Sequence, residues 1–454
     1  MVPFVKPGFL ERIGLHRPEL RAWALYDWAN SAFVLLVITA VFPIYYQTVA
    51  AAPLDPNHAT EIFARVTGVT LAIVAIASPV MGAFADTLGI RKLLLGVFLG
   101  LGVISTGSMF FIHKGDWTLA LILFAAGNFS IAATFVFYDA LLPHIASREE
   151  MDKVSTAGYA IGYLGSGLLL IVTLAVIQMP DVVGFPDAGA ATRASFIVVA
   201  VWWGIFSVPL FTRIKEPARL AVSPSVRETT RHTVMNLLQT FRELRTKYKQ
   251  ALRMLVALFV YNDGIGTIIR MATIFAASIE LPQQDIIMAV ILVQFVGIPA
   301  TFLFGWLAGK IGTKNSILLG LGIYCVITLV GYVMTSALEF YVLAILVGLV
   351  QGGTQALSRS LFAGMIPRHK STEFFGFFSV FEKFAGIFGP LIFSMMILMT
   401  GSTRDAVLSI ALFFVVGGIL LTKVRIEEGQ EAARVAEEEF SRRLEASAAR
   451  EGYA

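Results

Sequence analysis

Four ionisable residues of this chain fall inside stretches of apolar residues, namely Asp263, Arg359, Glu382 and Lys383. A charged side chain at bilayer depth costs about 2.5 kcal/mol or more, so each one needs a partner, water or a function. At a rise of 1.5 Å per residue, we expect all four near the midplane, about 12 to 16 Å from the ends of their helices. Together the four carry no net formal charge.

We hypothesise that these four residues form a neutral network that faces a central cavity. The expected pairs are Asp263 with Lys383 and Arg359 with Glu382, in alternation. Adjacent residues on a helix point about 100° apart, so Glu382 and Lys383 should reach different helices. The opposing charges suit a zwitterion, because its ammonium and carboxylate groups each need an opposite partner. The competing interpretation is a structural salt-bridge cluster that locks three helices together.

Asp27 lies about two turns inside the first apolar stretch, with Asn30 close by. Its place resembles that of Asp263 in the second half of the chain. Contact with a substrate or a proton is therefore one interpretation, and capping at the rim of the membrane is the other. A carboxylate in a site of low dielectric constant can exchange protons, so proton coupling stays open.

Uncharged polar residues form a second candidate set. They either line a cavity or bond neighbouring helices, and we weight these two interpretations equally. The set comprises Asn262, Gln351, Thr354, Gln355 and Ser358. Tyr138 and Asp139 precede Pro143, and we expect this pair to serve as a gate or an interface rather than to bind a solute.

The composition of the chain limits the class of protein to which it can belong. Of the 454 residues, 57% are hydrophobic and 15% charged, whereas soluble proteins have roughly 45 to 50% and about 25%. An ordinary cytosolic enzyme is excluded. The net charge of +4 makes nucleic acid a poor partner. The one cysteine and the six scattered histidines suggest no disulfide and no metal site.

Enzymatic chemistry has no candidate in the sequence. The closest approach to a phosphate loop, Gly305 to Lys310, lacks the glycine spacing and is followed by Ile311 where a magnesium ligand should stand. No nucleophile and base pair is recognisable. We therefore expect no cofactor and no enzyme activity, and a charged network without catalytic companions favours moving a solute.

Twelve apolar stretches are long enough to cross a bilayer as helices. The first six are Trp23 to Ala50, Ile62 to Ala85, Leu93 to Ile112, Thr118 to Leu142, Val154 to Gln178 and Ser195 to Phe211. The second six are Leu252 to Ala277, Ile286 to Ala308, Ser316 to Thr335, Phe340 to Phe362, Phe374 to Met399 and Ala406 to Thr422. The sequence thus predicts an all-α membrane protein with the lipid bilayer as its partner.

The distribution of charge predicts which end faces the cytoplasm. Threading the spans alternately places about 28 of the 35 Lys and Arg residues on one side and about four on the other. By the positive-inside rule, both termini and the middle loop are cytoplasmic.

The chain divides into four parts. We expect six-helix bundles at 1–212 and 252–422, a cytoplasmic linker at 213–251 and a cytoplasmic tail at 423–454. In the linker, apolar residues recur at helical spacing among basic ones, as in an amphipathic helix on the inner leaflet. That series is Val234, Leu237, Leu238, Phe241 and Leu244. The alternative for this linker helix is that it binds a protein partner. The sequence of the tail suggests no function.

The two bundles resemble each other in sequence. The segment from Gly82 to Lys92 joins spans two and three, and the segment from Gly305 to Lys314 joins spans eight and nine, about 223 positions later. Pro143 and Pro367 close spans four and ten at nearly the same offset. These correspondences in order indicate a duplication, as in transporters that rock around a site at the midplane.

This layout resembles the major facilitator superfamily. The loop from Gly82 to Lys92 resembles the signature of that superfamily between spans two and three, with Phe84, Thr87 and Ile90 as departures. The resemblance implies gating roles for Gly82, Asp86, Gly89 and Arg91, whereas the second loop has Gly309 at the Asp position and is expected to pack only.

Three further motifs resemble the branch with the fungal vacuolar amino-acid effluxers. They are Trp23 to Phe33, Tyr261 to Gly264 and Gly352 to Ser360. The resemblance implies a transporter of a small solute, an amino acid by analogy, that works by alternating access. We expect the chain to act as a monomer. Alternatives are an exporter of drugs or other small organics, a sensor that does not transport, and a lipid-modifying protein. Short external loops without a glycosylation sequon favour a bacterial inner membrane over a vacuole.

Overall fold

The computed structural model describes residues 8–217, 239–278, 281–386 and 388–451, and these residues form helices and no strand. Span one is built from α2 (Pro18–Ala32), the π-helix Phe33–Ala40, α3 (Phe42–Tyr45) and the π-helix Tyr46–Ala50. The next spans are α4 (Pro56–Leu88), α5 (Arg91–Ser108) with the 3-10 turn Met109–Phe111, α6 (Trp117–Ile145), α7 (Met151–Gln178) and α9 (Ala188–Arg213). Short helices α1 (Phe9–Arg12) and α8 (Pro180–Val183) lie outside them.

The second half repeats this plan. Its spans are α11 (Lys249–Ser278), α12 (Gln283–Ile311), α13 (Thr313–Val333), α14 (Ala337–Ala363), α15 (Ser371–Phe384) with α16 (Phe388–Thr400), and α17 (Thr403–Ser409) with α18 (Ala411–Thr422). The 3-10 turn Arg368–Lys370 precedes α15, and α19 (Ile426–Glu451) ends the chain. Twelve helical spans in the described residues are long and apolar enough to cross a membrane, which confirms the prediction.

Span eleven differs from the continuous helix that the sequence predicted. It breaks between α15 and α16, where Gly386 has a φ of 127° that side-chain-bearing residues rarely adopt. Pro390 lies in the first turn of α16, where its missing N–H leaves no helical hydrogen bond unmade. The break therefore has a local cause in the sequence.

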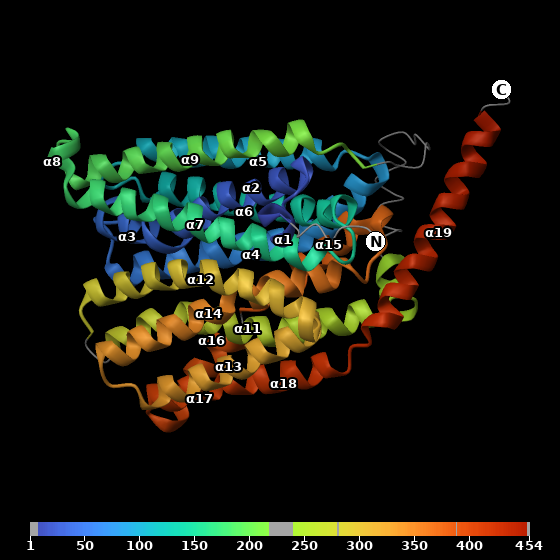
Figure 1. Cartoon of the computed structure of the whole chain (residues 1–454). Coiled ribbons are helices and arrows are strands. Elements are labelled where there is room, and N and C mark those ends of the chain that lie inside the picture. The colour runs from blue at the N-terminus through green and yellow to red at the C-terminus, as the bar shows by residue number, and fades with distance from the viewer. Residues whose placement is uncertain (1–7, 218–238, 279–280, 387, 452–454) are drawn as a thin grey trace.

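The halves form two bundles that lie side by side, blue to green and yellow to red in Figure 1. Across the boundary, α4 packs along α15 and α7 along α12. The two glycines that the sequence repeat paired lie in these contacts. A Cβ atom on Gly82 would lie 2.3 Å from the Thr372 carbonyl oxygen, and one on Gly305 would lie 2.2 Å from Thr156 Oγ1. Only glycine allows either approach.

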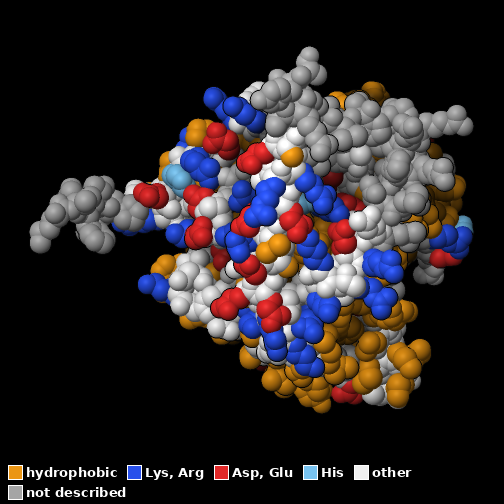
Figure 2. Space-filling view, turned by 90° about the vertical axis from the view of Figure 1, so that its right-hand side faces the viewer, with side chains coloured by type: hydrophobic (Ala, Val, Ile, Leu, Met, Phe, Trp, Pro, Cys, Tyr) orange, Lys and Arg blue, Asp and Glu red, His pale blue; other side chains and the backbone are white. Residues whose placement is uncertain are grey.

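The two ends of the bundle differ in charge. The end with α1 and α19, here called the basic end, gathers Lys and Arg side chains with Asp and Glu among them (Figure 2). The opposite end carries α8 (Figure 1). The predicted linker helix falls partly outside the described residues, which include Phe241 and Leu244 but not Val234, Leu237 or Leu238. Residues 239–246 are helical, and Leu244 is buried.

Candidate functional site

A cavity of about 430 Å³ lies between the two halves. Its lining comes from both bundles and runs from Asp27 and Glu382 toward Ile286 and Phe340, which begin spans eight and ten at the opposite end. Its polar lining includes Asp27, Asn30, Ser31, Asn128, Tyr159, Tyr163, Ser166, Gln294, Gln351, Gln355, Glu382 and Lys383. The walls nearer the opposite end are mainly aliphatic. The cavity thus has a charged floor and apolar walls.

Glu382 and Lys383 supply charges of opposite sign to that floor, beside the carboxylate of Asp27. Lys383 Nζ lies 3.2 Å from Glu382 Oε2, and the two side chains are 19% and 36% exposed for Lys383 and Glu382 respectively. The prediction that these neighbours reach different helices is wrong. Both side chains are long enough to bend together over the cavity, where Lys383 Nζ also lies 5.8 Å from the Phe135 ring centre.

Arg359 is the centre of a second ionic cluster. Its Nη2 donates to Asp27 Oδ2 at 3.2 Å, and its Nη1 donates to Asp139 Oδ1 at 3.1 Å. Its Nε donates to Ser155 Oγ at 2.9 Å and its Nη2 to the Ser155 carbonyl at 3.1 Å. The guanidinium fork thereby bonds three side chains, all of them from the first half, and Arg359 is 3% exposed.

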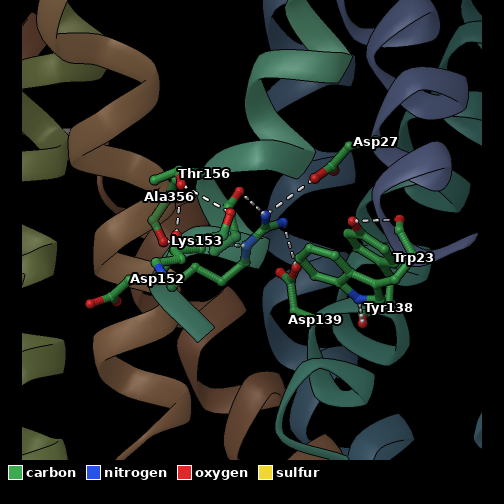
Figure 3. Close-up of polar contacts among 10 residues, drawn as sticks. Trp23, Asp27, Tyr138, Asp139, Asp152, Lys153, Thr156 and Ala356 are labelled. Atoms are coloured by element: carbon green, nitrogen blue, oxygen red, sulfur yellow. Dashed lines mark hydrogen bonds and ion pairs between the residues drawn. The ribbon is translucent and has the colours of Figure 1, made fainter. Parts of the chain in front are cut away.

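Aromatic rings enclose this guanidinium group. Its central carbon lies 4.5 Å from the Trp23 ring centre and 4.7 Å from that of Tyr159, within the range of cation–π attraction. Trp23 and Tyr138 hold one another, since each donates to the other's carbonyl oxygen at 3.1 Å (Figure 3). Gly158 leaves the space, because a Cβ atom there would lie 2.4 Å from Asp27 Oδ2.

The Arg359 cluster corrects two predictions. The expected pairs of Arg359 with Glu382 and of Asp263 with Lys383 are not those of this structure. Arg359 also lies near the end of α14 at Ala363, about 6 Å from that end, and not at the midplane. Asp27 and Asp139 come from spans one and four, so the cluster joins the two halves near the basic end (Figure 3).

Further contacts close the basic end around this cluster. Asp152, at the start of α7, accepts hydrogen bonds from Ser360 Oγ at 2.5 Å and from Thr313 Oγ1 at 2.6 Å. Ser155 Oγ donates to the Ala356 carbonyl oxygen at 2.7 Å. Thr313 belongs to the second copy of the loop motif, which therefore does more than pack.

A smaller chamber of about 60 Å³ adjoins the cavity floor. Glu382, Gln355, Tyr159 and Phe135 line both spaces. Asp139, Arg359, Asn262 and Ser358 also line the chamber, together with Tyr261, Leu258 and Phe378. A space of this volume and polarity is large enough for water molecules, which need about 10 to 15 Å³ each by this measure.

Asp263 lies apart from both ionic clusters. It is 1% exposed, and its Oδ1 accepts the backbone N–H of Gly389 at 2.9 Å, at the start of α16. Arg270 Nη1 donates to the Gly386 carbonyl oxygen at 2.8 Å. These two residues of α11 thus hold the break in span eleven, and the expected four-membered network is not formed. A carboxylate is favourable at a helix N-terminus.

The uncharged candidates divide between several environments. Gln351 and Gln355 line the cavity, as Asn30 does. Ser358 lines the chamber and shares a hydrogen bond of 2.6 Å with the Tyr261 hydroxyl. Thr354 is buried, and its Oγ1 lies where a side chain on Gly320 would stand, so it serves the contact between α13 and α14.

The loop that resembles the superfamily signature meets the start of span eleven. Asp86 Oδ1 accepts from Arg91 Nε at 2.7 Å, and Asp86 Oδ2 accepts the backbone N–H of Glu373 at 2.9 Å. Arg91 Nη2 donates to the His369 carbonyl oxygen at 3.3 Å. Gly89 ends α4 with a φ of 65°. All these contacts belong to the closed basic end.

Sequence reasoning missed several of these residues. Asp152, Ser155 and Tyr159 all lie on α7 and attracted no attention, although they recur near the basic end of one helix at a spacing of three to four residues. That spacing places them on one face and could have indicated a contact surface. In the described residues, no three His, Cys, Asp or Glu side chains are grouped so that they could hold a metal ion.

Comparison with known proteins supplies the remaining finding. The family model described as "Vacuole effluxer Atg22 like" matches residues 16–434. The uncharacterized MFS-type transporter YxiO of Bacillus subtilis (strain 168) is 34% identical over 91% of this chain and 96% of its own. Autophagy-related protein 22-1 of Phaeosphaeria nodorum is 23% identical, with coverage of 84% and 79%. The human organic anion transporter MFSD10 (TETRAN) shares the fold, with a TM-score of 0.66 at 14% identity and coverage of 91% and 100%.

Proposed function

From the premise that this chain belongs to the vacuole effluxer Atg22-like family of major facilitator transporters, we propose that it moves a small zwitterion, such as an amino acid, by alternating access. The observation that carries this proposal is the cavity of about 430 Å³ between the halves, with charges of both signs on its floor. Ligand sites in proteins are typically 300 to 1,000 Å³ and hold a few placed polar groups.

Each charged group of a zwitterion has a partner on the cavity floor. Lys383 supplies an ammonium group for the carboxylate of the solute. Glu382 and Asp27 supply carboxylates for its ammonium group, and Asn30 and Gln355 offer uncharged hydrogen-bonding groups. Charge-assisted bonds of this kind are about twice as strong as neutral ones. Apolar walls suit an aliphatic side chain that points toward the opposite end.

Asp27 connects the solute to the closed end. It lines the cavity, and its Oδ2 also accepts the hydrogen bond from Arg359. A bound ammonium group would compete with Arg359 for this carboxylate and weaken the ionic cluster that joins the halves. Binding in the cavity thereby favours separation of the halves at the basic end, which is the step that alternating access requires.

We place the basic end in the cytoplasm by the positive-inside rule, with a bacterial inner membrane as the location. The cavity of this state then faces the external side. A monomer suffices, because both halves of the cavity come from one chain. Proton coupling is a further part of the proposal, since the cluster holds two carboxylates against one guanidinium group.

Reconstitution in liposomes tests the proposal. Exchange of labelled neutral amino acids should occur with the parent protein, and Lys383→Gln or Glu382→Gln should weaken it roughly 10- to 100-fold, as expected for the loss of a hydrogen bond to a charged group. Lys423→Gln, an exposed lysine outside the cavity, is the matched control. Parent-like exchange in both cavity variants would contradict the proposed site, and indifference to an imposed pH gradient would remove proton coupling.

The aliphatic walls favour a second candidate, an exporter of amphipathic organic molecules. Such solutes would bury more apolar surface against Leu35, Ile38 and Val290 than a small amino acid can. A transported lipophilic cation that amino acids do not displace would support this candidate over the first.

A further inference from the structure

The segment 365–373, which connects span ten to span eleven and includes the first residues of α15, is held by the first half of the chain. Arg91 donates to the His369 carbonyl oxygen, and Asp86 accepts the Glu373 N–H, as described above. Ser371 Oγ donates to the Ala140 carbonyl oxygen at 3.0 Å. These bonds exist only while the two halves meet at the basic end, so the position of this segment reports the closed state.

The tail helix α19 holds the same segment from the other side. The rings of His369 and Phe440 are stacked, with centres 4.3 Å apart and planes within 4°. Arg368 Nε lies 3.7 Å from Glu437 Oε1. Gly429 packs so closely on Met365 that a Cβ atom there would lie 2.8 Å from the sulfur. One residue, His369, thus contacts the first half by its carbonyl and the tail by its ring.

The linker completes this arrangement. Lys370 Nζ lies 2.8 Å from Glu243 Oε2, on the helix at 239–246. Lys247 Nζ lies 3.4 Å from Glu439 Oε2 of the tail. Gln250 donates from Nε2 to Glu428 at 2.6 Å. The linker, the tail and the 365–373 segment therefore form one connected set of contacts at the basic end, which we place in the cytoplasm.

We propose that α19 and the 239–246 helix form a brace that favours the closed basic end by fixing the 365–373 segment against the first half. The inference rests on the alternating access of the proposed function and assigns a regulatory role to the tail. A partner that drew α19 away would release the segment and favour opening at the basic end.

The contacts of the brace differ in how much they are expected to stabilise the closed state. The ion pairs of Arg368 with Glu437 and of Lys247 with Glu439 are partly exposed to solvent, and such pairs contribute little stability. The stack of His369 on Phe440 is the specific contact, and it acts at the residue that Arg91 binds. We therefore expect Phe440→Ala to change the ratio of closed to open molecules roughly 2- to 10-fold, from the usual strength of aromatic pairs.

Distances between spin labels at the basic end measure this ratio. Glu149 is exposed in the first half and Lys310 in the second, and cysteines at both positions can be labelled in a Cys325→Ser background. We expect two distance populations in the parent and a larger long-distance population in Phe440→Ala. Val435→Ala, which shortens an exposed apolar side chain of the same helix, is the control and should leave the populations unchanged.

Charge exchange provides a second arm that cannot unfold the core. Glu437→Lys should enlarge the long-distance population slightly, because it breaks the ion pair with Arg368. Adding Arg368→Glu should return this population to that of the parent, because the pair re-forms with its charges exchanged. Parent-like populations in Phe440→Ala and in a chain without α19 would overturn the brace. A single distance population that no substrate or variant shifts would instead overturn alternating access, so the two failures are distinguishable.

Discussion

Replacing Arg359 tests how the basic end is closed. In Arg359→Gln, Asp27 and Asp139 lose the group that bonds both of them, while Arg359 itself is only 3% exposed in this state. Removing one partner of a buried ion pair costs about 3 to 5 kcal/mol. Once the halves separate, water solvates these groups, so the cost falls on the closed state alone.

That cost can be converted into a population. Every 1.4 kcal/mol is a factor of ten, so the ratio of closed to open molecules should fall roughly 100- to 4,000-fold. Protonation of one of the two carboxylates would offset part of the cost. The lower end of this range is therefore the expected result.

Labelling of an introduced cysteine measures the change. Ser379 is 4% exposed, and its hydroxyl lies 3.3 Å from Ser78 Oγ across the boundary between the halves. In a Cys325→Ser background, maleimide should reach Ser379→Cys only when the basic end opens. We expect Arg359→Gln to raise the labelling rate about tenfold or more, up to the limit set by the fully open state.

The control is Arg404→Gln, which removes a partly exposed arginine that lies away from the boundary cluster and donates to the Tyr332 carbonyl oxygen at 3.1 Å. It should leave the labelling rate unchanged. A rate in Arg359→Gln within twofold of the parent would refute the reasoning that this cluster holds the halves together.

Two further predictions concern stability. Gly158→Ala places a Cβ atom 2.4 Å from Asp27 Oδ2 and should lower the free energy of unfolding by about 1 to 3 kcal/mol, as overpacking does, whereas Gly100→Ala meets no atom within 4 Å. Thermal unfolding in detergent measures both, and equal midpoints would contradict the close packing. Burial would raise the pKa of the Glu243 carboxyl, but the hydrogen bond and the charge of Lys370 lower it below its ordinary 4.5. This pair therefore contributes stability above pH 4.5 and loses it as the pH falls through the lowered pKa of the folded state. The difference in midpoint between the parent and Lys370→Gln should be present at pH 7 and fade as the pH falls below 4.5. A difference that persisted in acid would contradict the role of the pair.

The lengths of the apolar stretches sufficed to predict the twelve spans. Each span forms a helix because a chain that crosses lipid must satisfy the hydrogen bonds of its own backbone groups. Gly82 and Gly305, paired in the sequence by their spacing, lie in equivalent contacts between the halves. The repeat of glycine in the sequence and the contact between the halves have the same cause, because two helices can approach this closely only at a residue without a side chain.

The partners of Arg359 could not be predicted in this way. Asp27 precedes it by 332 positions and Asp139 by 220, and their meeting depends on how each helix is rotated within its bundle. Matching charges by depth alone suggested Glu382 instead. The break in span eleven had a signal in Gly386 and Pro390, but the apolar stretch from Phe374 to Met399 predicted one continuous helix.

The two glycine contacts also determine which changes the protein tolerates. On α12, Gly305 touches Thr156 of the other half, while Gly309, one turn further on, has no atom within 4 Å of the place where a Cβ would stand. A single methyl group at the first would act as a wedge between the bundles, and at the second it would meet open space. Evolutionary drift on this face of the helix is thus restrained at one position and permitted at the next, one helical turn away.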